Sequence, residues 1–145
     1  MRYSAEADFL RRVEDPDDTT NRRRCLSEPE LQRLRADHPR LPDDFLDYLR
    51  EIGAGTFREC QFQVQDYLFT PDDLGLGDLY PVGAHVRFFG DNFSGDFSGF
   101  DLAEDSGHVI ELWHEDGTVY ETGRSFGAYI RERMLMGADG RDERE

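Results

Sequence analysis

The residues best suited to chemistry are carboxylates that gather between positions 91 and 105. They occur as Asp91-x-x-x-Gly95-Asp96 and as Asp101-x-x-Glu104-Asp105. Calcium is bound by six to eight oxygen ligands, and the calcium loop of helix–loop–helix proteins places them at alternate positions and ends in a glutamate. Because this stretch lacks that spacing, the sequence predicts no metal site here.

Two histidines, His108 and His114, lie six positions apart with the same strand parity. Two imidazoles on one strand face could form half of a zinc site. Zinc needs four ligands, and no thiol lies near this pair in the sequence. Histidines on a strand surface are therefore favoured over a zinc site.

Three glutamates, Glu111, Glu115 and Glu121, could pair as general acid and base across a hairpin. A solvated acidic face is the simpler interpretation. No nucleophile stands in a Gly-x-Ser-x-Gly setting, and no phosphate-binding glycine loop opens a helix. The sequence predicts a protein that is not an enzyme and that takes no cofactor.

The most informative stretch is Phe89–Leu102, which holds four phenylalanines and three aspartates. Its ends are rich in residues that favour strands, and its middle is rich in glycine, asparagine and aspartate, which favour tight turns. We expect a strand, a turn and a second strand, with the turn carrying acidic side chains and at least one aromatic side chain into solvent. The alternative is an ordinary turn with Phe93 and Phe97 in the core.

Net charge is concentrated in the middle of the chain. The sequence has 32 acids and 17 arginines, a balance of −15, and residues 41–121 alone hold 18 acids and 3 arginines. Such a charge repels nucleic acids and anionic membranes and speeds encounter with a basic protein. A solubilising surface is the alternative explanation.

The order expected from the boundary signals is helices, then a run of adjacent strands, then a last helix. Helices are expected at Ser4–Val13, from Ser27 to His38 behind a Ser27–Glu30 capping box, from Leu41 to Ile52, and at Phe126–Met136. From Thr56 the apolar period changes to two, with strands expected near Phe62–Phe69, His85–Phe89, Phe97–Leu102, Val109–His114 and Thr118–Glu121. Successive strands with short turns predict an α+β fold, an antiparallel meander with N- and C-terminal helices on one face and the other face open to a partner.

We divide the chain into an N-terminal extension, residues 1–26, a domain, residues 27–136, and a disordered tail, residues 137–145. The extension is expected to be a short helix followed by a polar linker, Glu14–Arg24. Cys25 and Cys60 are expected to be free thiols. No apolar run approaches a membrane span, and the N-terminus lacks the apolar core of a signal peptide, so a cytoplasmic location is expected.

Several motifs, in this order, resemble the SMI1/KNR4 (SUKH) superfamily. They are the helix and glycine turn of Leu41–Gly55, the element Leu68–Leu74, the strand–turn–strand Phe89–Leu102, and Val109–Glu121 with the final helix. The family usually has an Asn-Gly turn where this chain reads Gly53-Ala54-Gly55. The resemblance implies an α+β domain without catalysis. Many bacterial members are immunity proteins that neutralise a toxin, often a nuclease or deaminase, and fungal relatives are regulatory hubs.

These observations give a hypothesis: an immunity protein that covers a basic toxin with an acidic surface. The alternative is a regulatory scaffold that binds an endogenous partner protein, and the oligomeric state stays open. A neighbouring aromatic pair, Trp113 and Tyr120 across the Asp116-Gly117 turn, is expected to be core or half-core. The candidate partner-binding residues are Asp91, Phe93, Asp96, Asp101, Glu104, Asp105, Glu111 and Glu115.

Overall fold

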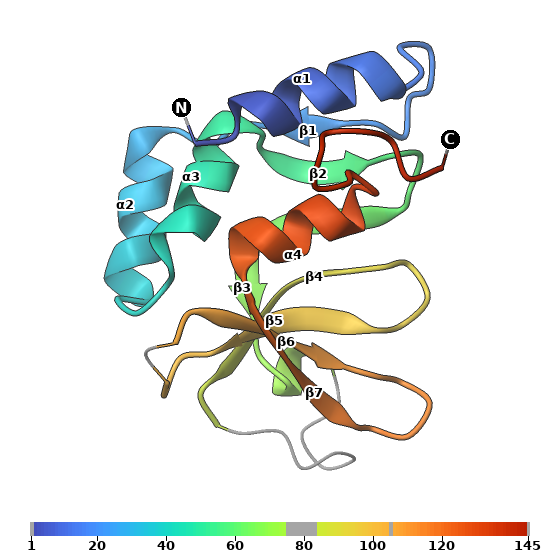
Figure 1. Cartoon of the computed structure of the whole chain (residues 1–145). Helices are drawn as coiled ribbons and strands as arrows, with labels where there is room; N and C mark the ends of the chain where they lie inside the picture. The colour runs from blue at the N-terminus through green and yellow to red at the C-terminus, as the bar shows by residue number, and fades with distance from the viewer. Residues whose placement is uncertain (1, 75–83, 105, 145) are drawn as a thin grey trace.

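Four helices and seven strands make up the structure (Figure 1). The computed structural model describes residues 2–74, 84–104 and 106–144. The helices are α1 (Ser4–Val13), α2 (Glu28–Asp37), α3 (Asp43–Glu51) and α4 (Phe126–Arg133), with a 3-10 turn η1 (Asp72–Leu74). The strands are β1 (Arg23–Arg24), β2 (Ala54–Phe57), β3 (Phe62–Phe69), β4 (Val86–Asp91), β5 (Phe97–Asp101), β6 (His108–Leu112) and β7 (Val119–Ser125).

The strands form one antiparallel sheet in the order of the sequence, from β1 to β7. Short turns join β2 to β3 and each strand from β4 to β6 to the next, so that these strands pair with the one before them. Helices α2 and α3 lie between β1 and β2, and a longer segment that includes η1 lies between β3 and β4. The predicted α+β fold, with N- and C-terminal helices packed on the sheet, is confirmed. In Figure 1 the helices lie together above and beside the sheet. No helix in the described part of the chain is long and apolar enough to cross a membrane.

Helix starts follow the predicted capping signals. Ser27 accepts a hydrogen bond from the Glu30 backbone N–H while the Glu30 carboxylate accepts one from the Ser27 N–H, which is the predicted capping box. Ser125 accepts the Ala128 N–H at the start of α4. These caps fix where α2 and α4 begin, and so how their apolar faces meet the sheet.

The main core lies between the helices and one face of the sheet. Phe45 of α3 and Phe126 of α4 lie 5.1 Å apart, and both rings contact Phe89 of β4 and Phe100 of β5. All four are buried, as is Leu49 one turn along α3. Aromatic rings bury large areas, and edge-to-face packing adds to that gain, so a chain with modest apolar content still builds a dense core.

A second apolar cluster lies on the far face of the sheet. Phe88 is buried beside Phe89 because consecutive strand residues point to opposite faces. The members of the cluster are Phe69, Val86, Phe88, Ile110 and Leu112, with Phe97 packed against them. All but Phe97 are buried, so this part of the far face is not the open surface that the sequence predicted.

The N-terminal extension packs on the domain. Phe9 and Leu10 of α1 are buried in the main core, and β1 pairs with β2 at the edge of the sheet. Glu14 and Arg23 form an ion pair at 2.7 Å, and both side chains are largely buried. The expected polar linker therefore folds back, because its charges find partners on the domain. The two cysteines are free and exposed, as predicted.

The C-terminal residues also make defined contacts instead of fraying as expected. Met136 and Asp142 form a β-bridge, and the Asp142 carboxylate pairs with Arg58 at 3.0 Å. Arg58 also donates to the carbonyl of Met134 at 2.9 Å. Arg58 is 3% exposed. A buried guanidinium needs a counter-charge, and the tail supplies it.

Candidate protein-binding surface

Two turns meet at one end of the sheet. The first joins β4 to β5 (92–96) and the second joins β6 to β7 (113–118). The Asp96 carboxylate accepts the His114 backbone N–H at 3.0 Å and contacts its ring Nδ1 at 2.8 Å. Burial opposes ionisation of Asp96, but hydrogen bonds from His114 and Asn92 outweigh it and lower its pKa. A Cβ on Gly95 would lie 3.2 Å from the His114 ring, so the two turns are in close contact.

The first turn holds Phe93 in solvent. The Asp91 carboxylate accepts the Phe93 N–H at 3.0 Å, and the Asn92 side-chain oxygen accepts the Ser94 N–H at 2.9 Å. These local bonds keep Phe93 at φ 65°, a left-handed conformation that is unfavourable for a bulky residue. Phe93 is 48% exposed. The sequence prediction of an aromatic side chain on this turn is confirmed.

The second turn carries a stacked aromatic pair. The Trp113 and Tyr120 rings lie 5.5 Å apart with an interplanar angle of 26°. They are 41% and 47% exposed. The predicted pairing across the turn is confirmed, but both side chains are exposed, so the expectation of a core or half-core pair is wrong. Val119 beside them is also exposed.

Glu111 is held behind this pair by a polar network. Its carboxylate accepts the Tyr129 hydroxyl at 2.6 Å and the Trp113 indole N–H at 3.3 Å. The Tyr129 hydroxyl also lies 2.6 Å from the Ser98 hydroxyl, and both of those residues are buried. Burial, and then the nearby carboxylate, raise the pKa of Tyr129 well above its ordinary range. The phenol therefore remains a donor and fixes the carboxylate beneath Trp113.

The carboxylates at this end of the sheet lie in a segment of the sequence that contains no arginine. Residues 88–123 contain no arginine, and five of their carboxylates, Asp91, Asp96, Glu111, Glu115 and Asp116, lie on or next to the two turns. We call the exposed part of this region the turn-end surface. It comprises Phe93, Asp96, Glu111, Trp113, Glu115, Asp116 and Tyr120. It combines half-exposed aromatic rings with carboxylates, a composition suited to a basic protein partner.

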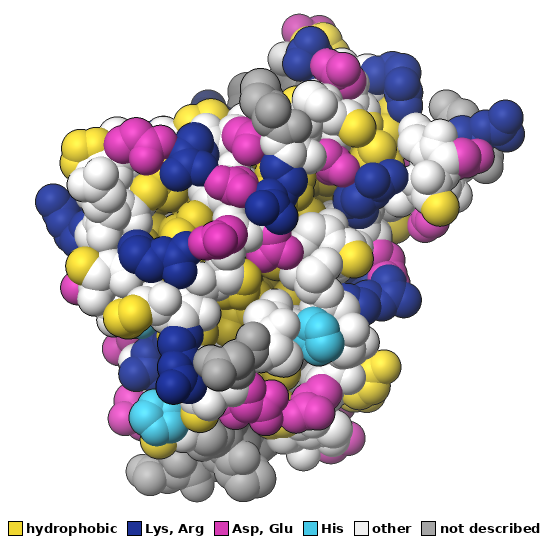
Figure 2. All heavy atoms as spheres, turned by 60° about the vertical axis from the view of Figure 1, so that its left-hand side comes forward, with side chains coloured by type: hydrophobic (Ala, Val, Ile, Leu, Met, Phe, Trp, Pro, Cys, Tyr) yellow, Lys and Arg dark blue, Asp and Glu magenta, His cyan; other side chains and the backbone are white. Residues whose placement is uncertain are grey.

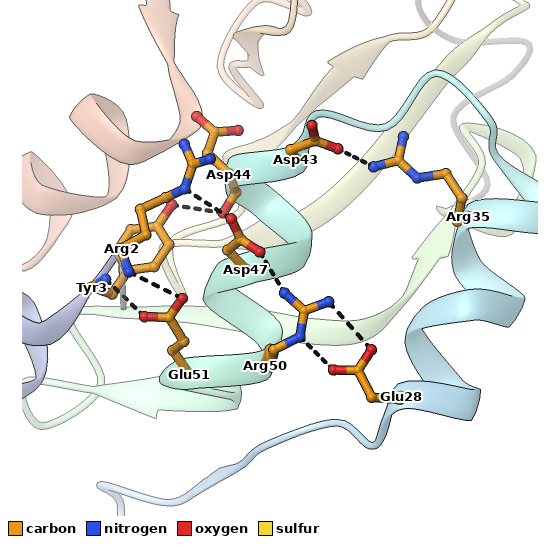
Figure 3. A network of polar contacts seen from close by, with 9 residues as sticks. All are labelled: Arg2, Tyr3, Glu28, Arg35, Asp43, Asp44, Asp47, Arg50 and Glu51. Atoms are coloured by element: carbon orange, nitrogen blue, oxygen red, sulfur yellow. Dashed lines mark hydrogen bonds and ion pairs between the residues drawn. The ribbon is translucent and has the colours of Figure 1, made fainter.

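The helical face offers a contrast, because its charges alternate. Figure 2 shows dark blue and magenta side chains interspersed over α2 and α3. In Figure 3, Arg50 lies between Glu28 and Asp47, at 2.6 and 2.5 Å, and Arg2 reaches the same Asp47 at 2.8 Å. Arg35 pairs with Asp43 close by. A hollow of about 480 Å³ lies among these groups, but their charges compensate one another.

The same network fastens the N-terminus to the helices (Figure 3). The Glu51 carboxylate accepts the Tyr3 backbone N–H at 2.8 Å, and the Tyr3 hydroxyl donates to the Asp44 carbonyl at 2.7 Å. Asp44 also accepts the Gly127 N–H at the start of α4, at 3.1 Å. An aspartate at a helix N-terminus is electrostatically favourable. These carboxylates hold the helices together, which leaves the turn end as the better candidate site.

The predicted site residues divide between the two ends of the sheet. Asp91, Phe93, Asp96, Glu111 and Glu115 belong to the two contacting turns and the strands that lead into them. Asp101 ends β5, roughly 13 Å from Phe97 at the rise of an extended strand, and Glu104 lies in the turn that follows. Asp105 lies outside the described residues.

The other chemical candidates separate in the fold. His108 begins β6 and His114 lies in the turn beyond it, so they do not share a strand as expected. Glu121 is in register with Ile110, whereas Tyr120 is opposite Glu111, so Glu121 and Glu111 point to opposite faces. The proposed acid–base pair does not form. Among the described residues no three His, Cys, Asp or Glu side chains converge on a possible metal position.

The residues that support the turn-end surface from below were not predicted from the sequence. Ser98 and Tyr129 are 31 positions apart and meet only because α4 packs over β5. No local pattern indicates this contact. Asp116 was recognised only as a turn residue, although its place beside Trp113 and Glu115 in the sequence was a usable signal.

Comparisons with known proteins assign no family to this chain. No family model matches the chain, and no curated protein matches it. The chain is similar to the crystal structure of Atu4351 from Agrobacterium tumefaciens, with 19% identity and a TM-score of 0.46. The alignment covers 76% of this chain and 45% of that protein, so this chain spans less than half of its length.

Proposed function

We propose that this protein is a non-catalytic binding domain that captures a basic partner protein on the turn-end surface. The observation that carries the proposal is the grouping of Phe93, Trp113 and Tyr120, all nearly half exposed, on two contacting turns in a stretch without arginine. Aromatic anchors surrounded by polar groups are the usual source of binding energy in protein interfaces.

The surface is prepared for binding in two ways. Hydrogen bonds from the Phe93 and Ser94 backbone N–H groups to the side chains of Asp91 and Asn92 hold Phe93 outward in an unfavourable backbone conformation, and strain of this kind tends to occur at functional positions. The Tyr129–Glu111–Trp113 chain fixes the indole ring. A side chain ordered before binding loses less entropy when the partner arrives, which raises affinity.

The finer assignment is an immunity protein of SMI1/KNR4 type. Its support is the order of the sequence motifs, together with an acidic surface suited to cover a basic groove. The partner would then be a toxin domain, with a nuclease or a deaminase the expected kind, since a nucleic-acid-binding groove is basic. Neutralisation would occur by occlusion, with no chemistry performed by this chain.

The alternative is a regulatory scaffold. A mobile, arginine-bearing linker over Glu14–Arg24 would favour it. This segment instead contributes β1 to the sheet and a largely buried ion pair, Glu14–Arg23, to the domain. No other feature of the described residues favours a scaffold over an immunity protein.

The test is co-expression with a basic toxin domain encoded beside the gene. We expect growth rescue and a stable complex. The double variant Phe93→Ala/Trp113→Ala should weaken the complex by roughly 100-fold or more, because each change removes an aromatic anchor. Tyr67→Ala is the matched control, since Tyr67 is an exposed aromatic residue of β3 outside this surface, and it should bind normally.

Two results would contradict the proposal. One is a complex that forms equally well with wild type and the double variant, which would place the binding site elsewhere. The other is the absence of both rescue and complex with every basic neighbour tested, which would remove the immunity assignment.

A further inference from the structure

The last strand of the sheet, β7, presents an open edge next to the turn-end surface. Strand order ends at β7, and among the described residues no strand pairs with its outer side. The opposite edge is the two-residue strand β1. A very short edge strand is one way in which proteins avoid unwanted pairing, and β7, with seven residues, lacks that protection.

The backbone groups that face outward can be assigned from the hairpin register. The Trp113 N–H donates to the Thr118 carbonyl at 2.9 Å, which makes these two residues a hydrogen-bonded pair. Such pairs alternate along an antiparallel ladder, so Tyr120 also bonds to β6 whereas Val119 and Glu121 direct their N–H and C=O groups outward. Beyond them the ladder is disturbed, since the register shifts and the Thr122 hydroxyl donates to the Val109 carbonyl.

The side chains around this edge indicate what would pair with it. Tyr120 and Trp113 lie on one face and Val119 on the other, and all three are exposed. Glu121 lies on the edge itself, on the face of Val119, whereas Glu111 of β6 lies on the face of Tyr120, with no arginine between residues 88 and 123. A segment with apolar side chains alternating with arginine or lysine would satisfy both the aromatic surface and the carboxylates.

We propose that the Val119–Glu121 edge of β7 receives an extended, basic segment of the partner protein as an added strand. This inference rests on the proposed function and specifies its binding mode. Main-chain hydrogen bonds to Val119 and Glu121 give the register, and the neighbouring rings and carboxylates select alternate side chains. The segment continues the sheet and covers Tyr120 and Trp113.

Two synthetic peptides of equal charge separate strand addition from simple attraction. The first alternates arginine with valine over seven residues, and the second has the same sequence with every backbone amide N-methylated, which keeps the charge and removes the N–H donors that a ladder needs. Backbone amide exchange of the full-length protein is measured with each peptide at low salt. The Arg–Val peptide should slow exchange at Val119 and Glu121 roughly tenfold, and the N-methylated peptide should leave it unchanged.

Substitutions at the edge provide the second test, in the complex with the partner. Proline at an outward-facing edge position removes no ladder bond to β6, so Glu121→Pro should fold and bind roughly tenfold or more weaker than Glu121→Ala, which removes only the charge. Equal binding by the two variants, or equal amide protection by the two peptides, would overturn strand addition. If strand addition were overturned but the Phe93→Ala/Trp113→Ala variant still lost binding, the proposed function would stand. If the Phe93→Ala/Trp113→Ala variant also bound normally, the proposed function would fail together with strand addition.

Discussion

At the scale of single residues, Tyr129 joins three parts of the molecule. Its hydroxyl lies 2.6 Å from both the Ser98 hydroxyl of β5 and the Glu111 carboxylate of β6. Its ring extends from α4 and packs against Phe62 and Phe89 of the sheet. A buried partner left without its hydrogen bond costs more than the bond itself contributes. This phenol therefore matters for both stability and the surface.

Tyr129→Phe should lower the free energy of unfolding by about 1–3 kcal/mol, because it leaves Ser98 and Glu111 without their donor or acceptor. Denaturant unfolding of both proteins gives the difference. Tyr67→Phe is the control, since Tyr67 is exposed and should change little. A loss of stability that is equal in the two variants would show that the network contributes nothing.

Glu30 gives a prediction about pH. The Arg24 guanidinium donates two hydrogen bonds of 2.9 Å to the Glu30 carboxylate, and Ser27 donates further ones to it. Together these bonds lower the pKa of Glu30 to about 2. The pKa of Glu30 in the folded protein lies below the value of about 4.3 for an unfolded chain. The ionised Glu30 therefore contributes its full stabilisation above about pH 4.3 and loses it as the pH falls toward 2.

Titration of the Glu30 carboxylate by NMR should give this low pKa in the wild type and a value closer to the ordinary range in Arg24→Ala. The shift should also shrink in high salt, because the pair is exposed. A wild-type pKa near 4.3 would contradict the assignment of this pair.

At the scale of elements, local signals predicted most helices and strands, and long-range contacts decided the rest. The capping box at Ser27 and the apolar spacing in α3 indicated those helices, and period-two alternation indicated β4 to β6. Strand β1 was missed because Arg23 and Arg24 have no apolar pattern and join the sheet through backbone pairing. The turn between β2 and β3, with Arg58 to Cys60 at positive φ, also gave no glycine signal.

Some residues of the candidate site could be predicted from local sequence, and others could not. Phe93 and Asp96 were found because turn residues cluster around them. The contact of their turn with His114 depends on the meander bringing residues 18 apart together. Asp101 was placed in the same site because it is near in sequence, yet it lies at the other end of its strand.

The C-terminal segment gives a prediction at this scale. Asp142→Ala removes the carboxylate from the buried Arg58 and should cost about 3 kcal/mol of folding free energy, because an unpaired charge remains in the interior. Asp139→Ala breaks an exposed pair with Arg141 in the same segment and should cost less than about 1 kcal/mol. Denaturant unfolding distinguishes them, and equal small effects would mean that the tail does not anchor Arg58.

At the scale of the whole molecule, charge is divided between two regions. On the α2–α3 face, carboxylates and arginines pair in a network (Figure 3). The turn end holds carboxylates and aromatic rings in a stretch that has no arginine. We expect this distribution of charge to guide a basic partner to the turn end, and added salt should slow that association.

Amide hydrogen exchange of the protein, free and in complex with its co-expressed basic partner, tests the central claim most directly. Protection gained on binding should be concentrated at residues 92–96 and 111–121, with little change over α2 and α3. Protection gained over α2 and α3, with the two turns unchanged, would contradict it.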